Sequence, residues 1–177
     1  MNRTGMSKRS SRVALGGVLT ALSLLLLYLA TLLPSGRLGV VAVAGLVPVV
    51  GVISGGFVTG LLCYAATGLL GFLLIPDKGC ALLYAVLLGL YPVLKGAIER
   101  LRKLPLELVL KLVFFNGIAS LLFFGFSKLF FPLLPELLHK PLYLYLMGNV
   151  VFLIYDFGVS KLITYYVTRI RPATRKH

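Results

Sequence analysis

The sequence predicts an all-α integral membrane protein, a six-helix bundle whose N-terminus and C-terminus both lie on the cytoplasmic side. Three observations support this prediction. Hydrophobic residues make up 59% of the 177-residue chain, above the roughly 45–50% of an ordinary soluble domain, and the mean hydropathy is +0.98. The apolar residues form long runs. The basic residues gather in short clusters between these runs, as they do in the loops of membrane proteins.

The first apolar run, at about residues 13–33, is long enough to cross the hydrocarbon core as a helix, which takes about 20 residues. We therefore expect a retained first span and not a signal peptide, whose apolar region is shorter. The run ends at Pro34-Ser35-Gly36, a turn that a helix does not easily continue through.

The second and third runs are separated only by Ser54-Gly55-Gly56, so we predict that they are antiparallel neighbours. The second, at about 38–53, contains Pro48 and is flanked by glycines. This pattern fits an ordinary span and also fits a broken or re-entrant helix that lines a cavity. The third, at about 57–75, ends at Pro76.

The fourth run, at about 80–94, is slightly short and leads into an amphipathic basic segment at 95–103. The fifth and sixth runs, at about 106–131 and 142–167, are each long enough to cross with some tilt at about 1.5 Å per residue. No repeat or low-complexity linker interrupts the chain. We therefore predict a single transmembrane domain over residues 1–177.

The orientation follows from the basic residues in the connections, because positively charged loops are retained in the cytoplasm. Six spans place three rich clusters on one side: Arg3, Lys8, Arg9 and Arg12; Lys95, Arg100, Arg102 and Lys103; and Arg169, Arg171, Arg175 and Lys176. The opposite loops hold only Arg37, Lys78 and Lys140. An odd number of spans would break this asymmetry. We expect a multi-pass protein of a bacterial plasma membrane, surrounded by the lipid bilayer.

Composition also argues against several functional classes. The chain has 18 basic and 5 acidic residues, but no basic stripe is interleaved with stacking aromatic residues, so we expect no nucleic-acid partner. Cys63 and Cys80 have no His or Cys at ligand spacing, and we expect neither a disulfide nor a metal site. No hydrolase, metalloprotease or nucleotide-binding motif is present, and we expect no enzyme and no cofactor.

Asp156 lies deep in the sixth run, about 16 Å from its cytoplasmic end at 1.5 Å per residue. An ionised carboxylate at that depth costs at least ~2.5 kcal/mol, so it should face the bundle interior and have a partner or water. On the antiparallel fifth span, Lys111 is the candidate ion-pair partner and Asn116 a candidate ligand contact. Two interpretations stay open. Asp156 contacts a substrate or ion, or it forms a structural pair that joins two helices.

Further candidates for ligand contact are Tyr84 and Tyr91, which recur with Lys95 at helical spacing on the fourth span, and Asn149 on the sixth. Tyrosines in such helices more often pack against neighbours or reach lipid headgroups with their hydroxyls. Convergence of these groups with Asp156 on one cavity would favour a solute-binding protein over a structural one.

Small residues form a face on the first span, at Ala14, Gly17 and Ala21. Small residues at such spacing let another helix backbone approach closely. The approaching helix belongs either to the same bundle or to a second membrane subunit, and the pattern alone does not separate these two interpretations.

The first span, which reads from Arg12 as RVALGGVLTALS, resembles the opening of the substrate-binding S components of energy-coupling factor (ECF) vitamin transporters. Those are small six-helix proteins whose first helix carries spaced small residues. The glycine-rich region from Gly45 to Gly71 is also similar to that family's small-residue core. The resemblance implies docking of Ala14, Gly17 and Ala21 on a transmembrane coupling subunit, capture of a vitamin-like solute, and uptake driven by separate ATPase subunits. The alternative is a non-transporting structural or regulatory protein that partners other membrane subunits.

Overall fold

A computed structural model describes residues 3–34, 36–98, 104–165 and 168 of the chain. All secondary structure in this described part is helical. Several of the basic residues that predict the orientation lie outside it: Arg100, Arg102, Lys103, Arg169, Arg171, Arg175 and Lys176.

The prediction of six membrane-spanning helices is confirmed at the level of length and composition. Six stretches of the described chain are helical, long and apolar enough to cross a membrane: Ser10–Leu32, Arg37–Gly55, Phe57–Leu74, Lys78–Lys95, Pro105–Gly125 and Pro141–Tyr165. The orientation of the termini stays a prediction. The contacts of the chain group into two compact units, Met1–Val93 (unit 1) and Leu94–His177 (unit 2), where the sequence predicts one transmembrane domain.

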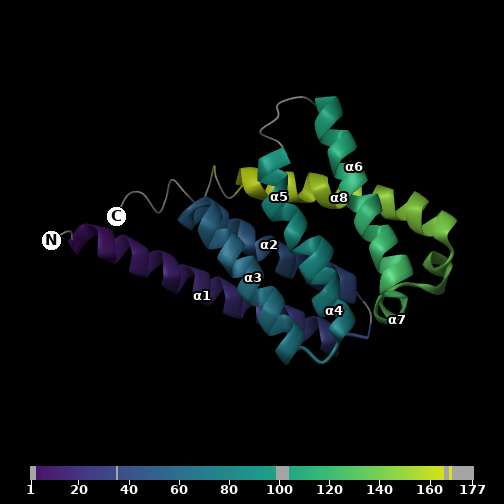
Figure 1. Cartoon of the computed structure of the whole chain (residues 1–177), viewed down its shortest axis with the longest axis horizontal. Coiled ribbons are helices and arrows are strands. Elements are labelled where there is room, and N and C mark those ends of the chain that lie inside the picture. The colour runs from purple at the N-terminus through teal and green to yellow at the C-terminus, as the bar shows by residue number, and fades with distance from the viewer. Residues whose placement is uncertain (1–2, 35, 99–103, 166–167, 169–177) are drawn as a thin grey trace. The chain divides into compact units, whose positions relative to one another are not determined.

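Unit 1 begins with three helices that pack side by side: α1 (Arg3–Leu32), α2 (Arg37–Gly55) and α3 (Phe57–Leu74) (Figure 1). Its core includes Leu19 of α1, Val47 of α2 and Cys63 of α3. The second span is one continuous helix with Pro48 inside it, and not a broken or re-entrant segment. The α2–α3 contact is close because position 60 is glycine: a Cβ there would lie 2.7 Å from the carbonyl oxygen of Pro48.

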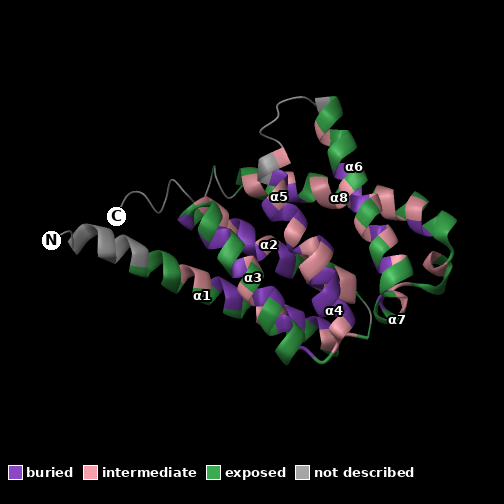
Figure 2. Ribbon diagram, viewed as in Figure 1, coloured by how far each residue is buried: buried purple, intermediate pink, exposed green. Residues whose placement is uncertain are grey.

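The fourth span changes its helical geometry along its length. It starts as α4 (Lys78–Leu83), continues as the π-helix η1 (Tyr84–Leu88) and ends as α5 (Leu90–Ile98). The division between the two units falls inside α5, after Val93. α4 is mostly buried, as its colour in Figure 2 shows.

In unit 2, α6 (Leu104–Ser120) packs against α8 (Pro141–Tyr165). α6 continues as the π-helix η3 (Leu121–Gly125), and the regular helix breaks at Phe126, short of the predicted end at residue 131. The connection to α8 is built from short elements: α7 (Ser127–Phe130) and the 3₁₀ turns η4 (Phe131–Leu133) and η5 (Glu136–His139).

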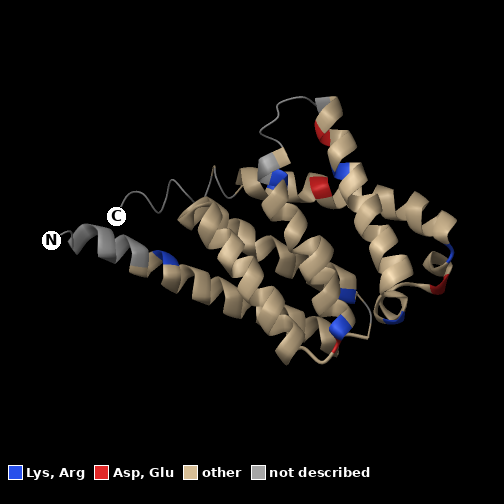
Figure 3. Ribbon diagram, in the orientation of Figure 1, with Lys and Arg blue, Asp and Glu red and all other residues tan. Residues whose placement is uncertain are grey.

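Much of the surface of α6 and α8 is apolar and exposed, as the green segments in Figure 2 show. Leu142, Val151 and Ile154 of α8 are each more than 60% exposed. A surface of this kind is costly in water and suits acyl chains. Figure 3 shows that charged residues are sparse along the described helices, which agrees with a membrane setting.

Candidate functional site

An ion cluster inside unit 2 joins Asp156 of α8 to Lys95 of α5 and Lys111 of α6. The Lys111 Nζ donates to Asp156 Oδ2 at 3.1 Å, and the Lys95 Nζ donates to Asp156 Oδ1. The Lys95 side chain is fully buried, whereas the Asp156 side chain is 17% exposed. Both carboxylate oxygens therefore face an ammonium group.

The cluster solves an energetic problem that the sequence creates. Each ionised group in the hydrocarbon region costs at least ~2.5 kcal/mol unless it has a partner or water. Here one carboxylate faces two lysines from different helices, so the cluster links α5, α6 and α8. Chemically, such a cluster holds helices together, and it also offers a carboxylate and ammonium groups to a polar solute or a proton.

The two asparagines that the sequence singles out lie opposite each other across α6 and α8. The Asn116 Nδ2 donates to Asn149 Oδ1 at 2.9 Å, and the Asn149 Nδ2 donates back to Asn116 Oδ1 at 3.0 Å. Each amide nitrogen also donates to a carbonyl oxygen of its own helix, that of Leu112 or Tyr145. Both N–H donors of each side chain are thus in use.

These pairs belong to a longer series along α6 and α8. Phe115 and Phe152 stack with ring centroids 4.7 Å apart, and the hydroxyls of Ser120 and Tyr145 lie 2.6 Å apart. From one pair to the next, the residue number rises along α6 and falls along α8. This is the pattern of two antiparallel neighbouring helices. The polar pairs replace contacts that lipid cannot provide. This geometry supports a structural role for Asn116 and Asn149.

Tyr84 and Tyr91 are fully buried and belong to unit 1, whereas Asp156 and the two asparagines belong to unit 2. The predicted stripe of Tyr84 and Tyr91 on one helical face assumes a regular α-helix. The π-helix η1 inserts an i→i+5 turn, with the Gly89 N–H donating to the Tyr84 carbonyl oxygen at 2.8 Å. A π-turn holds one more residue than an α-turn, so it changes the relative direction of the two side chains.

A groove between α1 and α3 lies in unit 1, with a volume of about 640 Å³. Gly17 and Ala21 line it, and its buried lining residues include Thr20, Thr59 and Cys63. A Cβ at position 17 would meet no atom within 4 Å. Ala14, on the same face of α1, is exposed. Among the described residues of unit 1, no other helix therefore fills the small-residue face of α1.

Comparisons of the chain with protein-family profiles, curated proteins and solved structures found no match. The candidate sites therefore rest on the geometry of the chain itself.

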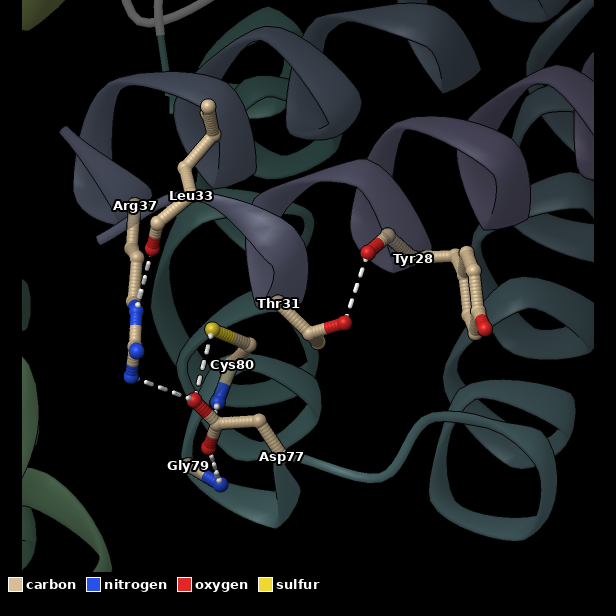
Figure 4. Close-up of polar contacts among 7 residues, drawn as sticks. All are labelled: Tyr28, Thr31, Leu33, Arg37, Asp77, Gly79 and Cys80. Atoms are coloured by element: carbon tan, nitrogen blue, oxygen red, sulfur yellow. Dashed lines mark hydrogen bonds and ion pairs between the residues drawn. The ribbon is translucent and has the colours of Figure 1, made fainter. Parts of the chain in front are cut away.

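One polar cluster at the other end of unit 1 is absent from the sequence-based candidates. Figure 4 shows Asp77 accepting hydrogen bonds from the backbone N–H groups of Gly79 and Cys80 at 2.9 and 3.3 Å, so it caps α4. The Arg37 Nη1 lies 3.3 Å from Asp77 Oδ2, and its Nε donates to the Leu33 carbonyl oxygen at 2.9 Å. The cluster ties the turn before α2 to the turn before α4, which supports a structural role.

Sequence reasoning also missed the contact between Lys95 and Asp156. The predicted stripe treats Lys95 as the end of a helical face, near the membrane surface. The signal that could have revealed this contact is the shortage of carboxylates. Asp156 is the one acidic residue of the predicted sixth span at 142–167, whereas the chain has 18 basic residues in all. A buried lysine at the end of an adjacent span is a natural partner for such a carboxylate, because its long side chain reaches inward.

Proposed function

We propose that this protein is the solute-binding membrane subunit of an ECF-type uptake transporter, and that it docks on a transmembrane coupling subunit through α1. The observation that carries the proposal is the open groove lined by Gly17 and Ala21. The resemblance of the first span to S components supplies the partner: a coupling subunit assembled with ATPase subunits.

The groove suits a partner helix for two physical reasons. Small residues let two helix backbones approach closely, which strengthens packing where no hydrophobic force drives helices together. The groove is also mainly apolar along α1 and α3, and Arg12 lines it near the start of the apolar stretch Ser10–Leu32. Asp77, which pairs with Arg37, is the one acidic residue of unit 1, so Arg12 offers its cation to a carboxylate or phosphate outside this unit.

The remaining features of the proposal are topological. Both termini lie in the cytoplasm of a bacterial cell, and the turn at 77–79 faces outward, because the basic residues cluster on one side. The solute is small and vitamin-like, as in the family that the first span resembles. Asp156, Tyr84 and Tyr91 are the candidate contacts that the pairing of Asn116 with Asn149 leaves in place.

A pull-down from native membranes tests the docking. Gly17→Leu/Ala21→Leu fills the groove with two large side chains while leaving the helix hydrophobic. The unchanged protein should capture both the coupling and the ATPase subunits, and the variant should capture at least tenfold less of both. Gly117→Leu is the matched control, since a Cβ at this exposed glycine of α6 also meets no atom within 4 Å. It should retain both partners.

Two outcomes would reject the proposal. In the first, the unchanged protein comes out of the membrane without ATPase subunits. In the second, the doubly substituted protein loses its folded monomer in detergent before any partner is added, which would assign Gly17 and Ala21 to packing within the bundle.

The second candidate function is a structural or regulatory membrane protein that binds another membrane subunit without transporting a solute. The saturated amides of Asn116 and Asn149 favour it, because groups predicted to receive a solute instead bind each other. Capture of a membrane partner that lacks an ATPase, together with loss of that partner in Gly17→Leu/Ala21→Leu, would select this alternative.

A further inference from the structure

Two buried hydroxyl groups in unit 1 have no other atom placed at hydrogen-bond geometry. They are Thr67 Oγ1 on α3 and Tyr84 Oη at the start of η1. Both residues are fully buried, with 0% of their surface exposed. Thr67 neighbours the Tyr84 hydroxyl, and Ser23 of α1 lies close to the same group. Three elements of unit 1 thus bring hydroxyl groups to one place.

Such groups are expensive to leave unsatisfied. Nearly all buried polar atoms in native proteins have a hydrogen-bond partner, and each exception needs an explanation. A hydroxyl without a partner in an apolar environment costs about 1–3 kcal/mol by protein mutational data. Membrane helices also have no bulk water nearby to supply a partner. The two hydroxyls therefore point to a bound hydrogen-bonding group.

The local structure holds the Tyr84 ring in place. Its ring stacks with that of Tyr64, with centroids 6.1 Å apart. It also folds back over Gly89, where a Cβ would lie 2.8 Å from Tyr84 Cζ, so the ring occupies space that only glycine leaves open. The π-helix η1 produces this arrangement, and π-turns inside α-helices occur frequently at functional sites. The position of the hydroxyl is consequently fixed before anything binds.

The surroundings select an uncharged group. The titratable neighbours of the Tyr84 hydroxyl are Cys63 and Tyr64, which are neutral at physiological pH. Arg12, Arg37 and Asp77 of unit 1 lie at or near the ends of the helical stretches that are long and apolar enough to span a membrane. An ion between Thr67 and Tyr84 would lack a counter-charge, whereas a hydroxyl or carbonyl group needs none.

We propose that Thr67 and Tyr84 form an intramembrane binding site for one small uncharged hydrogen-bonding group. The shared chemistry has two sources, a water molecule or a hydroxyl or carbonyl group of a neutral solute. A bridging group of either kind accepts from one hydroxyl and donates to the other, or accepts from both. The site is independent of the docking of α1: it concerns the interior of unit 1, and its test needs no partner subunit.

A double-mutant cycle on the purified full-length protein tests the site. Tyr84→Phe and Thr67→Val each remove one hydroxyl with little change of shape. If both hydroxyls hold one bridging group, each single variant lowers the melting temperature, and the double variant lowers it by less than the sum, because the first substitution already releases the group. Tyr28→Phe is the matched control, since Tyr28 is 50% exposed on α1, and it should leave the melting temperature unchanged.

The proposal is wrong if each single variant raises the melting temperature or leaves it unchanged, and the effects add in the double variant. The two hydroxyls would then not bind one shared group. A high-resolution experimental structure of the unchanged protein covers the case that a variant does not fold: density within hydrogen-bond distance of both oxygens supports the site, and direct packing without such density refutes it.

Native mass spectrometry then distinguishes a bound solute from a bound water molecule. A mass excess that Tyr84→Phe/Thr67→Val loses identifies a solute, and coupling without a mass excess identifies water.

Discussion

The ion cluster of unit 2 predicts a large loss of stability when Asp156 alone is changed. Asp156→Asn keeps the shape of the side chain but removes the negative charge that faces Lys95 and Lys111. At 3.1 Å between Lys111 Nζ and Asp156 Oδ2, Coulomb's law with an effective dielectric constant of about 20 gives a gross attraction of roughly 5 kcal/mol. Removing one partner of a buried pair costs about 3–5 kcal/mol in mutational studies. The Asp156 side chain keeps 17% exposure, so we expect the lower end, about 3 kcal/mol.

A combined variant separates the value of the cluster from the cost of breaking it. Lys95→Met/Lys111→Met/Asp156→Leu replaces all three charged groups with apolar side chains of similar length. Buried ion pairs replaced in this way are often neutral for stability, because the desolvation cost disappears with the attraction. We therefore expect the combined variant to lie within about 1 kcal/mol of the unchanged protein, although it carries more substitutions than Asp156→Asn.

The assay is equilibrium unfolding in mixed micelles, followed by helical circular dichroism because the chain has no tryptophan. Lys161→Met is the control: Lys161 is an exposed residue of α8 whose Nζ lies 5.2 Å from the Phe157 ring centroid, a contact worth about 0.5–1 kcal/mol. Two results would refute the reasoning: an Asp156→Asn variant no less stable than Lys161→Met, or a combined variant as unstable as Asp156→Asn. If Asp156→Asn stays folded and loses a bound solute, the carboxylate serves a binding site.

Two further predictions concern the α6–α8 pair and the topology. A double-mutant cycle of Asn116→Ala and Asn149→Ala should give a coupling free energy of about 0.6–1.7 kcal/mol in micelle unfolding, the range for interhelical hydrogen bonds in membranes; zero coupling would remove the amide pair as a structural element. Reporter fusions after Lys78 should report the exterior and fusions after Lys103 the cytoplasm, because the basic clusters are retained inside. A cytoplasmic signal after Lys78 would contradict the orientation.

The six helices that are long and apolar enough to span a membrane could be predicted, because length and apolar composition can be read from the sequence. At Pro48, by contrast, the sequence does not determine whether the second span is a broken or a continuous helix. The missing N–H of Pro48 and the flanking glycines fit both a broken and a continuous helix, and the structure has a continuous one. Proline is tolerated inside membrane helices when neighbouring groups satisfy the freed backbone atoms. Those neighbours come from tertiary packing, which the local sequence does not contain.

The π-helices η1 and η3 could not be predicted for the same reason. η1 depends on the Tyr84 ring lying over Gly89, and the Tyr64 hydroxyl donates to the Ala85 carbonyl oxygen within it. The break at Phe126 shortens the fifth span, although apolar residues continue to Phe131, interrupted only by Ser127 and Lys128. Hydrophobicity predicts how long a membrane segment is, but it does not predict where the regular helix breaks within that segment.

The pairs across α6 and α8 show that the depth of a residue in its predicted span is not enough to identify its partner on the neighbouring helix. Helical rise places Asn116 and Asp156 at a similar level when each is measured from the predicted end of its span. In the structure Asp156 lies against Lys111, and Asn116 lies against Asn149, about two helical turns away along α8. Helix ends predicted from sequence are uncertain by about two to four residues each, so depth measured from two such ends does not fix which residues face each other. Within that range, chemical complementarity sets the register: carboxylate pairs with ammonium, and amide with amide.

This complementarity bears on where a neutral solute would gain most from binding. At Asn116 or Asn149 a ligand must first displace hydrogen bonds that already use every amide N–H, so each new bond largely replaces an old one. At Thr67 and Tyr84 no such bond is lost, because both hydroxyls lack a partner. The same number of ligand hydrogen bonds therefore yields more net free energy at the hydroxyls. A neutral solute should consequently lose more affinity on Tyr84→Phe than on Asn149→Ala, whereas an anionic solute should depend first on the lysines around Asp156.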